Sequence, residues 1–152
     1  MRVLLDTNVL IYSVTADEGE KHHAARRLIA ALGDQRIAVS SQVLSEYANV
    51  LTHGRRYGRD AQSVQDDIAD MLFVWEVFPL HGGVIMNALE AHSRWQLPYY
   101  DAQIWAAAAL NAIPIVLSED FQDGAVLGGV RFMNPFAEGF DPAVLLEPDG
   151  AE

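Results

Sequence analysis

The sequence predicts an α/β fold, a three-layer sandwich with a short central parallel sheet of four to five strands. Short and almost wholly apolar runs, typical of strands buried on both faces, alternate with longer segments whose apolar residues recur at helical spacing. This alternation is typical of a parallel sheet with helices on its faces. The length of 152 residues suits one compact domain.

Each predicted strand is a short apolar run next to turn or capping residues. The first strand ends in an acid, Asp6, and the fourth follows the turn-prone pair Ile113 and Pro114. The five strands are predicted at Arg2–Asp6, Arg36–Val39, Trp75–Leu80, Ile115–Ser118 and Gly129–Met133.

The predicted helices have apolar stripes and recognisable ends. In the second helix, Ala24 and Leu28 share one face, and Gly33 follows as a C-cap glycine. Ser40 or Ser41 is the expected N-cap of the third helix. Helices are predicted at Asn8–Ser13, Glu20–Leu32, Gln42–Thr52, Asp60–Val74, Gly83–Trp95 and Tyr100–Asn111.

The composition excludes several classes of function. The chain has no cysteine, which rules out disulfides, thiolate nucleophiles and cysteine-ligated metals. Its net charge of −11, from 21 acids and 10 bases, argues against a surface that coats nucleic acid. No apolar run approaches the ~20 residues of a membrane span, and no cleavage site follows the apolar N-terminus. We therefore expect a soluble, cytoplasmic protein.

Charge is distributed unevenly along the chain. Residues 138–152 contain acids and no base, and Lys21 is the only lysine of the whole chain. We therefore predict a folded domain over residues 1–137, followed by an acidic tail, residues 138–152, that is extended or partly disordered.

Four positions place an acid at the end of a buried element or beside an apolar stripe. Asp6 closes the first strand, and Asp120 follows the fourth, with Asp123 three residues later. Glu46 borders the stripe of its helix, and Asp101 lies in the first turn of the last helix. Singly, each has an ordinary role as a cap, turn or edge residue. Together they point to the carboxyl ends of the strands, where open α/β sheets bind ligands.

Carboxylates that converge at one sheet edge cannot all stay ionised unaided, because like charges at short range raise one another's pKa. A hard divalent cation removes this repulsion, and oxygen ligands without cysteine favour Mg²⁺ or Mn²⁺. Mg²⁺ held by carboxylates usually acts on phosphate substrates. The acids therefore predict a metal-dependent site for a phosphate ester.

Four segments resemble the PIN-domain ribonucleases, and among these the VapC-type toxins of type II toxin–antitoxin pairs. They occur in the family's order, and the resemblance spans Met1 to about Pro135. The first and third segments are the more specific, whereas the second rests on one glutamate in a helix. The segments are LLDTNVL at Leu4–Leu10, SEYANVL at Ser45–Leu51, YYDAQIWAAA at Tyr99–Ala108 and LSEDFQDG at Leu117–Gly124.

The resemblance implies a four-carboxylate cluster that holds one or two Mg²⁺ or Mn²⁺ ions. Asp6 and Asp101 match the family's principal metal ligands, and Glu46 and Asp120 match its other two acids. The fourth segment departs from the pattern because it also offers Asp123, and the sequence leaves open which of the two aspartates completes the site. We favour Asp120 for its distance after the strand.

Three neighbouring residues match supporting positions of the family. Thr7 and Asn8 match strand-end residues that orient ligands and bound water, and Ser118 matches a hydroxyl that hydrogen-bonds within the site. The resemblance implies a metal-dependent endoribonuclease that cleaves single-stranded or loop RNA, as the toxin of a toxin–antitoxin pair. The alternative is a PIN-like module that binds RNA or protein without cleaving, and its signature would be the loss of one or more acids.

Other classes with an acid after the first strand fit less well. A receiver domain needs a lysine late in the sheet, and a haloacid-dehalogenase-type phosphatase needs an aspartate at position 8 and a downstream lysine. Position 8 is Asn8, and Lys21 comes too early for either class. No GxGxxG motif follows the first strand, which excludes a dinucleotide fold. The five histidines show no i, i+4 pair beside a carboxylate, so we expect none to bind metal.

Three surfaces are expected to meet partners. The basic segment His53–Arg59, predicted as a loop, offers arginines for phosphates and Tyr57 for stacking on a base. The resemblance implies a homodimer built on the helices Gly83–Trp95 and Tyr100–Asn111, with the small-residue run Ala106–Ala109. It also implies a cognate antitoxin protein that covers the site. The expected RNA-binding residues are Arg55, Arg56 and Arg59, and the candidate antitoxin anchors are Phe73, Trp75, Trp95, Tyr99 and Tyr100.

Overall fold

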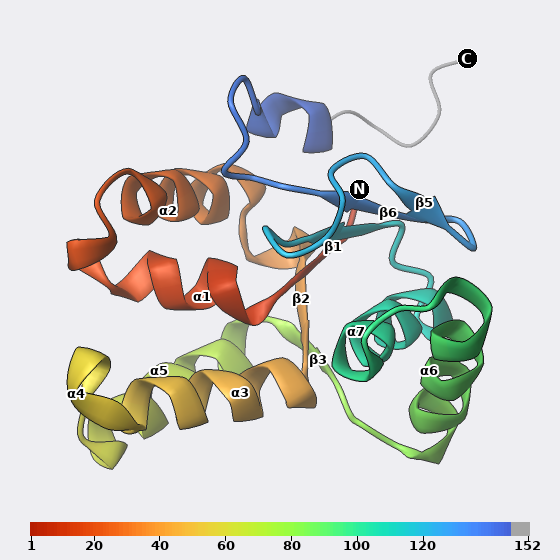
Figure 1. The fold of residues 1–152 in the computed structure, drawn as a ribbon. Coiled ribbons are helices and arrows are strands. Elements are labelled where there is room, and N and C mark those ends of the chain that lie inside the picture. The colour runs from red at the N-terminus through yellow and green to blue at the C-terminus, as the bar shows by residue number, and fades with distance from the viewer. Residues whose placement is uncertain (147–152) are drawn as a thin grey trace.

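The computed structural model describes residues 1–146 as a six-stranded sheet between two layers of helices (Figure 1). Its strand order is β3-β2-β1-β4-β6-β5, and the first five strands in this order run parallel to one another. This confirms the predicted three-layer α/β fold. The strands are β1 (Val3–Leu5), β2 (Ile37–Ser40), β3 (Glu76–Phe78), β4 (Ile115–Leu117), β5 (Val126–Leu127) and β6 (Val130–Met133).

All five predicted strands form, and the structure adds a sixth. β5 has only two residues and pairs antiparallel with β6, so no apolar run announces it in the sequence. The indole N–H of Trp105 donates to the carbonyl of Leu127 at 2.9 Å, which ties this hairpin to the helix layer.

The predicted long helices also form, each with ends within two residues of the prediction. The segment His53–Arg59, however, is not a plain loop, because Gly54–Tyr57 form a short helix, α4, that ends at Gly58 with φ 50°. The long helices are α1 (Thr7–Val14), α2 (Glu20–Leu32), α3 (Ser41–Thr52), α5 (Ala61–Val74), α6 (Gly82–Trp95) and α7 (Tyr99–Leu110). Short 3-10 turns, η1, η2 and η3, occupy Ala16–Glu18, Asp34–Arg36 and Pro142–Leu145.

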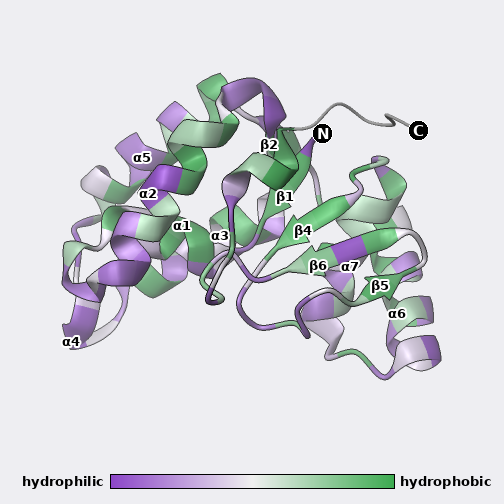
Figure 2. Ribbon diagram, turned by 90° about the horizontal axis from the view of Figure 1, so that it is seen from above, coloured by the Kyte–Doolittle hydropathy of each residue, from purple (hydrophilic) through white to green (hydrophobic). Residues whose placement is uncertain are grey.

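Two groups of helices cover the sheet. The helices α1, α2, α3 and α5 pack against one another on one side of the strands, and α6 and α7 pack on the other (Figure 1). The strands form the apolar centre, and hydrophilic residues lie mainly on the outer helix surfaces (Figure 2). Val3, Leu4 and Leu5 of β1 are fully buried, as expected for a central parallel strand. Within residues 1–146, the structure has no helix long and apolar enough to cross a membrane.

Local sequence explains the ends of the helices that lead to the sheet edge. The Ser40 hydroxyl, directly after β2, accepts a hydrogen bond from the Val43 N–H at 3.2 Å and so caps α3. Gly33 ends α2 with φ 69°, a backbone conformation that suits glycine. In α7, the run Ala106–Ala109 differs from the expected interface role, because Ala106, Ala107 and Ala108 are buried inside the monomer.

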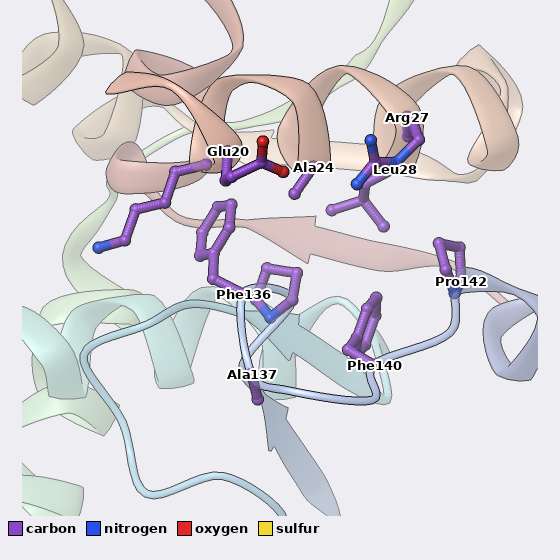
Figure 3. Close-up of a pocket in the computed structure, with 10 residues that line it drawn as sticks. Glu20, Ala24, Arg27, Leu28, Phe136, Ala137, Phe140 and Pro142 are labelled. Atoms are coloured by element: carbon purple, nitrogen blue, oxygen red, sulfur yellow. The ribbon is translucent and has the colours of Figure 1, made fainter. Parts of the chain in front are cut away.

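Residues 138–146 differ from the predicted extended tail, because they pack onto α2. Leu145 of η3 is fully buried, and Phe136, Phe140 and Pro142 line a cavity of about 240 Å³ against α2 (Figure 3). The prediction rested on the acids of residues 138–152 and overlooked apolar residues such as Phe140 and Leu145, which supply the burial. The rest of the predicted tail, residues 147–152, lies outside the described residues.

We expect Leu145→Ala to lower the free energy of unfolding by about 2–4 kcal/mol, because it opens a cavity where Leu145 is buried against the domain. The matched control is Val144→Ala, whose side chain is 46% exposed, and it should cost less than about 0.5 kcal/mol. Urea denaturation measures both. Equal effects of the two substitutions would mean that η3 does not belong to the folded core.

Candidate active site

The strand order creates a crevice between β1 and β4. The chain runs from β1 to β2 and β3 in one direction and then returns to β4 on the other side of β1. Such a switch point leaves a gap beyond the carboxyl ends of the two strands, where ligands of open α/β sheets bind. Leu5 pairs with Leu117, and the Asp6 N–H donates to the Leu117 carbonyl at 3.0 Å. Asp6 and Ser118 therefore emerge side by side at this gap.

Asp6 is buried, and both of its carboxylate oxygens accept hydrogen bonds. It is the N-cap of α1, where its Oδ1 accepts the Thr7 N–H at 2.7 Å. Its Oδ2 accepts the Ser118 hydroxyl at 2.6 Å and the Asn8 amide at 3.3 Å. Burial raises the pKa of Asp6 to about 6 despite these donors, and the negative charges of Asp120 and Glu46 add to the rise.

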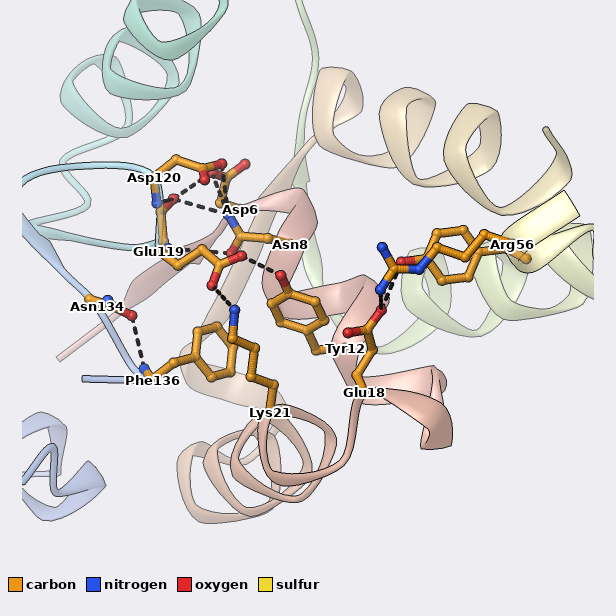
Figure 4. Close-up of polar contacts among 12 residues, drawn as sticks. Asp6, Asn8, Tyr12, Glu18, Lys21, Arg56, Glu119, Asp120, Asn134 and Phe136 are labelled. Atoms are coloured by element: carbon orange, nitrogen blue, oxygen red, sulfur yellow. Dashed lines mark hydrogen bonds and ion pairs between the residues drawn. The ribbon is translucent and has the colours of Figure 1, made fainter. Parts of the chain in front are cut away.

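Asn8 connects two of the predicted acids across the crevice. Its amide donates to Asp6 and also to Asp120 Oδ2 at 3.0 Å, as Figure 4 shows. The Asp120 N–H donates to the Ser118 hydroxyl at 3.1 Å, which fixes the start of the loop after β4. Thus Asn8 and Ser118, predicted as supporting residues, position both aspartates.

Glu46 and Asp101 approach from the two helix layers. The Thr7 hydroxyl donates to Glu46 Oε2 at 3.1 Å, and Gln42, one turn earlier on α3, donates to Glu46 Oε1 at 2.8 Å. Asp101 lies in the first turn of α7, half-buried. Burial raises the pKa of Asp101, and the charges of Asp120 and Glu46 raise it further.

The four predicted acids therefore sit within electrostatic range of one another. Asp120 and Glu46 each act on the pKa of both Asp6 and Asp101, which links all four carboxyl groups around one crevice. Asp123 is placed differently: its Oδ1 accepts the Asn134 N–H at 2.9 Å, so it braces the loop against the segment after β6.

The carboxylates of the site accept hydrogen bonds from neighbouring donor groups. Among residues 1–146, no three histidine or acidic side chains lie close enough to grip a single ion without adjustment. The carboxylate oxygens of Asp6 and Glu46 instead accept hydrogen bonds from neighbouring side chains and the Thr7 N–H.

A second polar cluster, which the sequence analysis missed, adjoins Asp120. The Tyr12 hydroxyl and the Lys21 ammonium both donate to Glu119, the latter at 2.7 Å (Figure 4). The contact with Glu119 and partial burial raise the pKa of Tyr12 to about 12. The cluster joins α1 and α2 to the loop that carries Asp120. No sequence spacing predicts it, because the three residues come from separate elements.

Two of the three arginines in the basic segment His53–Arg59 form ion pairs, which the sequence did not predict. Arg56 pairs with Glu18 at 2.5 Å, and Arg59 pairs with Asp67 at 2.6 Å, where Asp67 also accepts the Tyr47 hydroxyl. Within the described residues, Arg55 is the arginine of this segment without an ion pair. Arg56 and Arg59 thus have structural roles that the sequence could not reveal.

The fold and the site define a class: α/β proteins that gather acids beyond the carboxyl ends of a parallel sheet. The family model of the PIN domain matches residues 3–122, and the chain therefore belongs to the PIN domain family. A sequence comparison with curated proteins gives no match.

Solved structures share the fold at low sequence identity. A toxin–antitoxin complex from Klebsiella pneumoniae matches with a TM-score of 0.65 and 18% identity, over 88% of this chain and 98% of that one. VapC20 of Mycobacterium tuberculosis, described as a sarcin-ricin loop cleaving toxin, matches with a TM-score of 0.63 and 22% identity, over 75% and 86%. FitAcB from Neisseria gonorrhoeae matches with a TM-score of 0.68 and 16% identity, over 88% and 97%.

We expect Asp6 to make stability depend on pH. Its pKa is about 6 in the folded protein against an ordinary 3.8, so folding favours the protonated form. The free energy of unfolding should therefore fall as the pH rises from about 4 to about 6, by on the order of 3 kcal/mol in total. Asp6→Asn should lose this component of the pH dependence.

Denaturation in EDTA at pH 4 and pH 7 measures the effect as the difference between wild type and Asp6→Asn at each pH. The same substitution at the exposed Asp123 is the control. A difference between wild type and Asp6→Asn that stays constant over this range would show that Asp6 is not held in its protonated form by burial.

Proposed function

We propose that this protein is a metal-dependent endoribonuclease that cleaves single-stranded or loop RNA, and that it is the toxin of a toxin–antitoxin pair. The observation that carries the proposal is the cluster of Asp6, Glu46, Asp101 and Asp120 at the switch point of a PIN-family fold. A module that only binds RNA would not need all four acids.

The donor set fits Mg²⁺ or Mn²⁺. It consists of carboxylates alone, the ligands that these hard cations prefer, and the described residues place no histidine among them. The raised pKa values of Asp6 and Asp101 reflect burial and repulsion that a cation would offset. In this proposal the four acids hold the ion, with Asp120 in preference to Asp123, whose carboxylate already braces the loop.

The ion would neutralise the acids, activate water and stabilise the charge that develops on the phosphodiester. The chain's own residues prepare for this. Ser118 and Asn8 orient the Asp6 carboxylate, and Asn8 holds Asp120 at the same time. Thr7 keeps Glu46 turned toward the crevice. These contacts supply the positioning on which such catalysis depends.

RNA must approach a chain whose net charge is −11, so any basic contact has to be local. The basic segment remains part of the proposal in modified form. Arg55 is free to contact a phosphate, whereas Arg56 and Arg59 would first have to leave Glu18 and Asp67. We therefore assign Arg55 the main electrostatic contribution of this segment and the other two a smaller one.

The antitoxin proposal rests on an apolar groove of about 400 Å³ between α2 and α5. Val14, Ile29, Val74 and Trp75 line it, and Phe73 beside it is 90% exposed. An amphipathic segment of a partner protein suits such a groove. The structural neighbours include toxin–antitoxin complexes, which supports a partner of this kind.

We also propose a homodimer, built on the exposed face of α6. Ile85, Met86 and Leu89 are between 37% and 68% exposed on one helix. An apolar patch of this kind is typical of an interface.

Trp95, a candidate antitoxin anchor, instead packs edge-on against Trp105 with ring centroids 4.9 Å apart.

The proposed activity is tested with purified protein and single-stranded RNA. Wild type should cleave only when Mg²⁺ or Mn²⁺ is present, and Asp6→Asn and Asp101→Asn should each slow cleavage by about 100-fold or more. Asp123→Asn is the matched control and should retain most of the activity. Cleavage by either crevice variant at the wild-type rate would refute the assignment of the site.

Metal binding has its own readout in thermal unfolding. Mg²⁺ at a hundredfold excess over Kd should stabilise wild type by about 2.7 kcal/mol, which raises Tm by several degrees. Because Asp101 is repelled by Asp120 and Glu46, apo Asp101→Asn should melt no lower than apo wild type and should lose most of the rise with Mg²⁺. An ordinary helix-dipole role predicts the opposite, a lower apo Tm and an unchanged rise with metal.

A further inference from the structure

A second groove opens beside the acid crevice, between α3 and the start of α7. It has a volume of about 870 Å³, within the range of small-molecule sites. Glu46, which accepts a hydrogen bond from the Thr7 hydroxyl next to Asp6, also lines this groove, so the groove adjoins the acid cluster. Apart from the aliphatic Leu80, the remaining lining is polar or aromatic: Ser41, Gln42, Ser45, Asn49, Tyr99, Tyr100 and Gln103.

Gln103 carries an unusual feature for a side chain in this groove. It is only 4% exposed, and its amide N–H donates to the Tyr99 hydroxyl at 3.0 Å. Its Oε1 is buried without a hydrogen-bond partner, and it is the one such side-chain atom found in residues 1–146. An unpaired buried acceptor destabilises the structure, and a ligand N–H that reached this atom would remove that cost.

The rim of the groove offers a flat aromatic surface for stacking. Tyr100 is 66% exposed although it is a large aromatic residue, and it directly precedes Asp101. The Tyr100 carbonyl accepts the Gln42 amide at 3.3 Å, and Gln42 also holds Glu46. The Tyr100 backbone is thus tied to the same hydrogen-bond chain as a crevice acid, which places this residue beside the site.

We propose that this groove binds one unpaired nucleobase next to the scissile phosphate, and that Gln103 determines which base is accepted. The inference rests on the proposed nuclease function and adds a base-specific subsite to it. Gln103 Oε1 accepts an N–H of the base edge, and the Tyr100 ring stacks on its face.

A nucleobase fits these features better than other ligands do. Bases present N–H donors on their edge and an apolar face, which is the combination that stacking aromatics and amide side chains recognise in single strands. Because a base in a duplex has its edge paired and its faces stacked, the groove selects single-stranded or looped RNA. A second copy of the chain, covering the groove through Tyr100 and Leu80, is the competing occupant.

The test uses Gln103→Leu, which removes the amide and keeps a similar volume. Its matched control is Gln62→Leu, the same change on the exposed surface of α5, outside the groove. Single-stranded RNA oligonucleotides that differ at one base are used twice, for cleavage in Mg²⁺ and for binding in EDTA by fluorescence anisotropy. Wild type and Gln62→Leu should prefer one base by roughly 3- to 10-fold, the effect of one neutral hydrogen bond. Gln103→Leu should bring this preference to within about twofold.

A modified base separates recognition from a general loss of structure. Methylation that removes the donor N–H of the preferred base, at the ring nitrogen of guanine or uracil or twice at the amino group of adenine or cytosine, should weaken binding to wild type by the same factor and leave Gln103→Leu unaffected. Tyr100→Leu, a change at the surface that should not affect folding, should weaken binding to every base by roughly 5-fold or more, since stacking is insensitive to base identity. This variant keeps the proposal testable if Gln103→Leu does not fold.

Each outcome decides between the two proposals. If wild type cleaves with metal but Gln103→Leu keeps the same base preference, the subsite is wrong and the nuclease stands. If wild type cleaves nothing but binds RNA with a preference that Gln103→Leu loses, the nuclease is wrong and the subsite stands. Equal binding of all bases by wild type overturns the subsite. A fall in light-scattering mass from dimer to monomer in Tyr100→Leu would make the groove an interface and would also overturn it.

Discussion

The pairing of β1 with β4 is the constraint on which the rest of the site depends. It places the N–H of Asp6 against the carbonyl of Leu117, so that two chain segments 112 residues apart leave the sheet together. The contact of the buried Asp6 carboxylate with Ser118, and the link from Asn8 to Asp120, follow from that register. A shift of one residue would turn Asp6 to the other face of the sheet and leave Ser118 without its partner.

The crevice is a compromise between opposed electrostatic demands. Burial and neighbouring carboxylates disfavour the charge on Asp6, whereas the Ser118 hydroxyl and the Thr7 N–H favour it. The structure resolves the conflict by giving the acids their own donors: Asn8 for Asp120, and Gln42 for Glu46. These donors keep four acids near one another in a folded chain, and they hold the carboxylates in an arrangement that a cation would tighten.

The sequence predicted those features of the molecule that local patterns encode. Apolar strand runs and helix stripes predicted the fold. Acids at element ends or beside a helix stripe pointed to Asp6, Glu46, Asp101 and Asp120, because the carboxyl ends of parallel strands meet at one edge of the sheet. Contacts between distant elements leave no such pattern. The Tyr12–Glu119–Lys21 cluster is of this kind, and so is the unpaired Oε1 of Gln103, which depends on what its neighbours do not offer.

The same distinction explains why charge was a poor guide to the surface. The basic segment near Arg56 stood out because its bases are dense in sequence, yet Glu18 and Asp67 come from elsewhere to pair with two of them. The only lysine is likewise committed to Glu119. In a chain of net charge −11, arginines that are already paired contribute little to phosphate binding, since a cation contributes only while its charge is available. In the base-specific subsite that we propose, the face and the edge of a base supply further contacts to a single strand. The groove with Tyr100 and Gln103 beside the acids offers contacts to both.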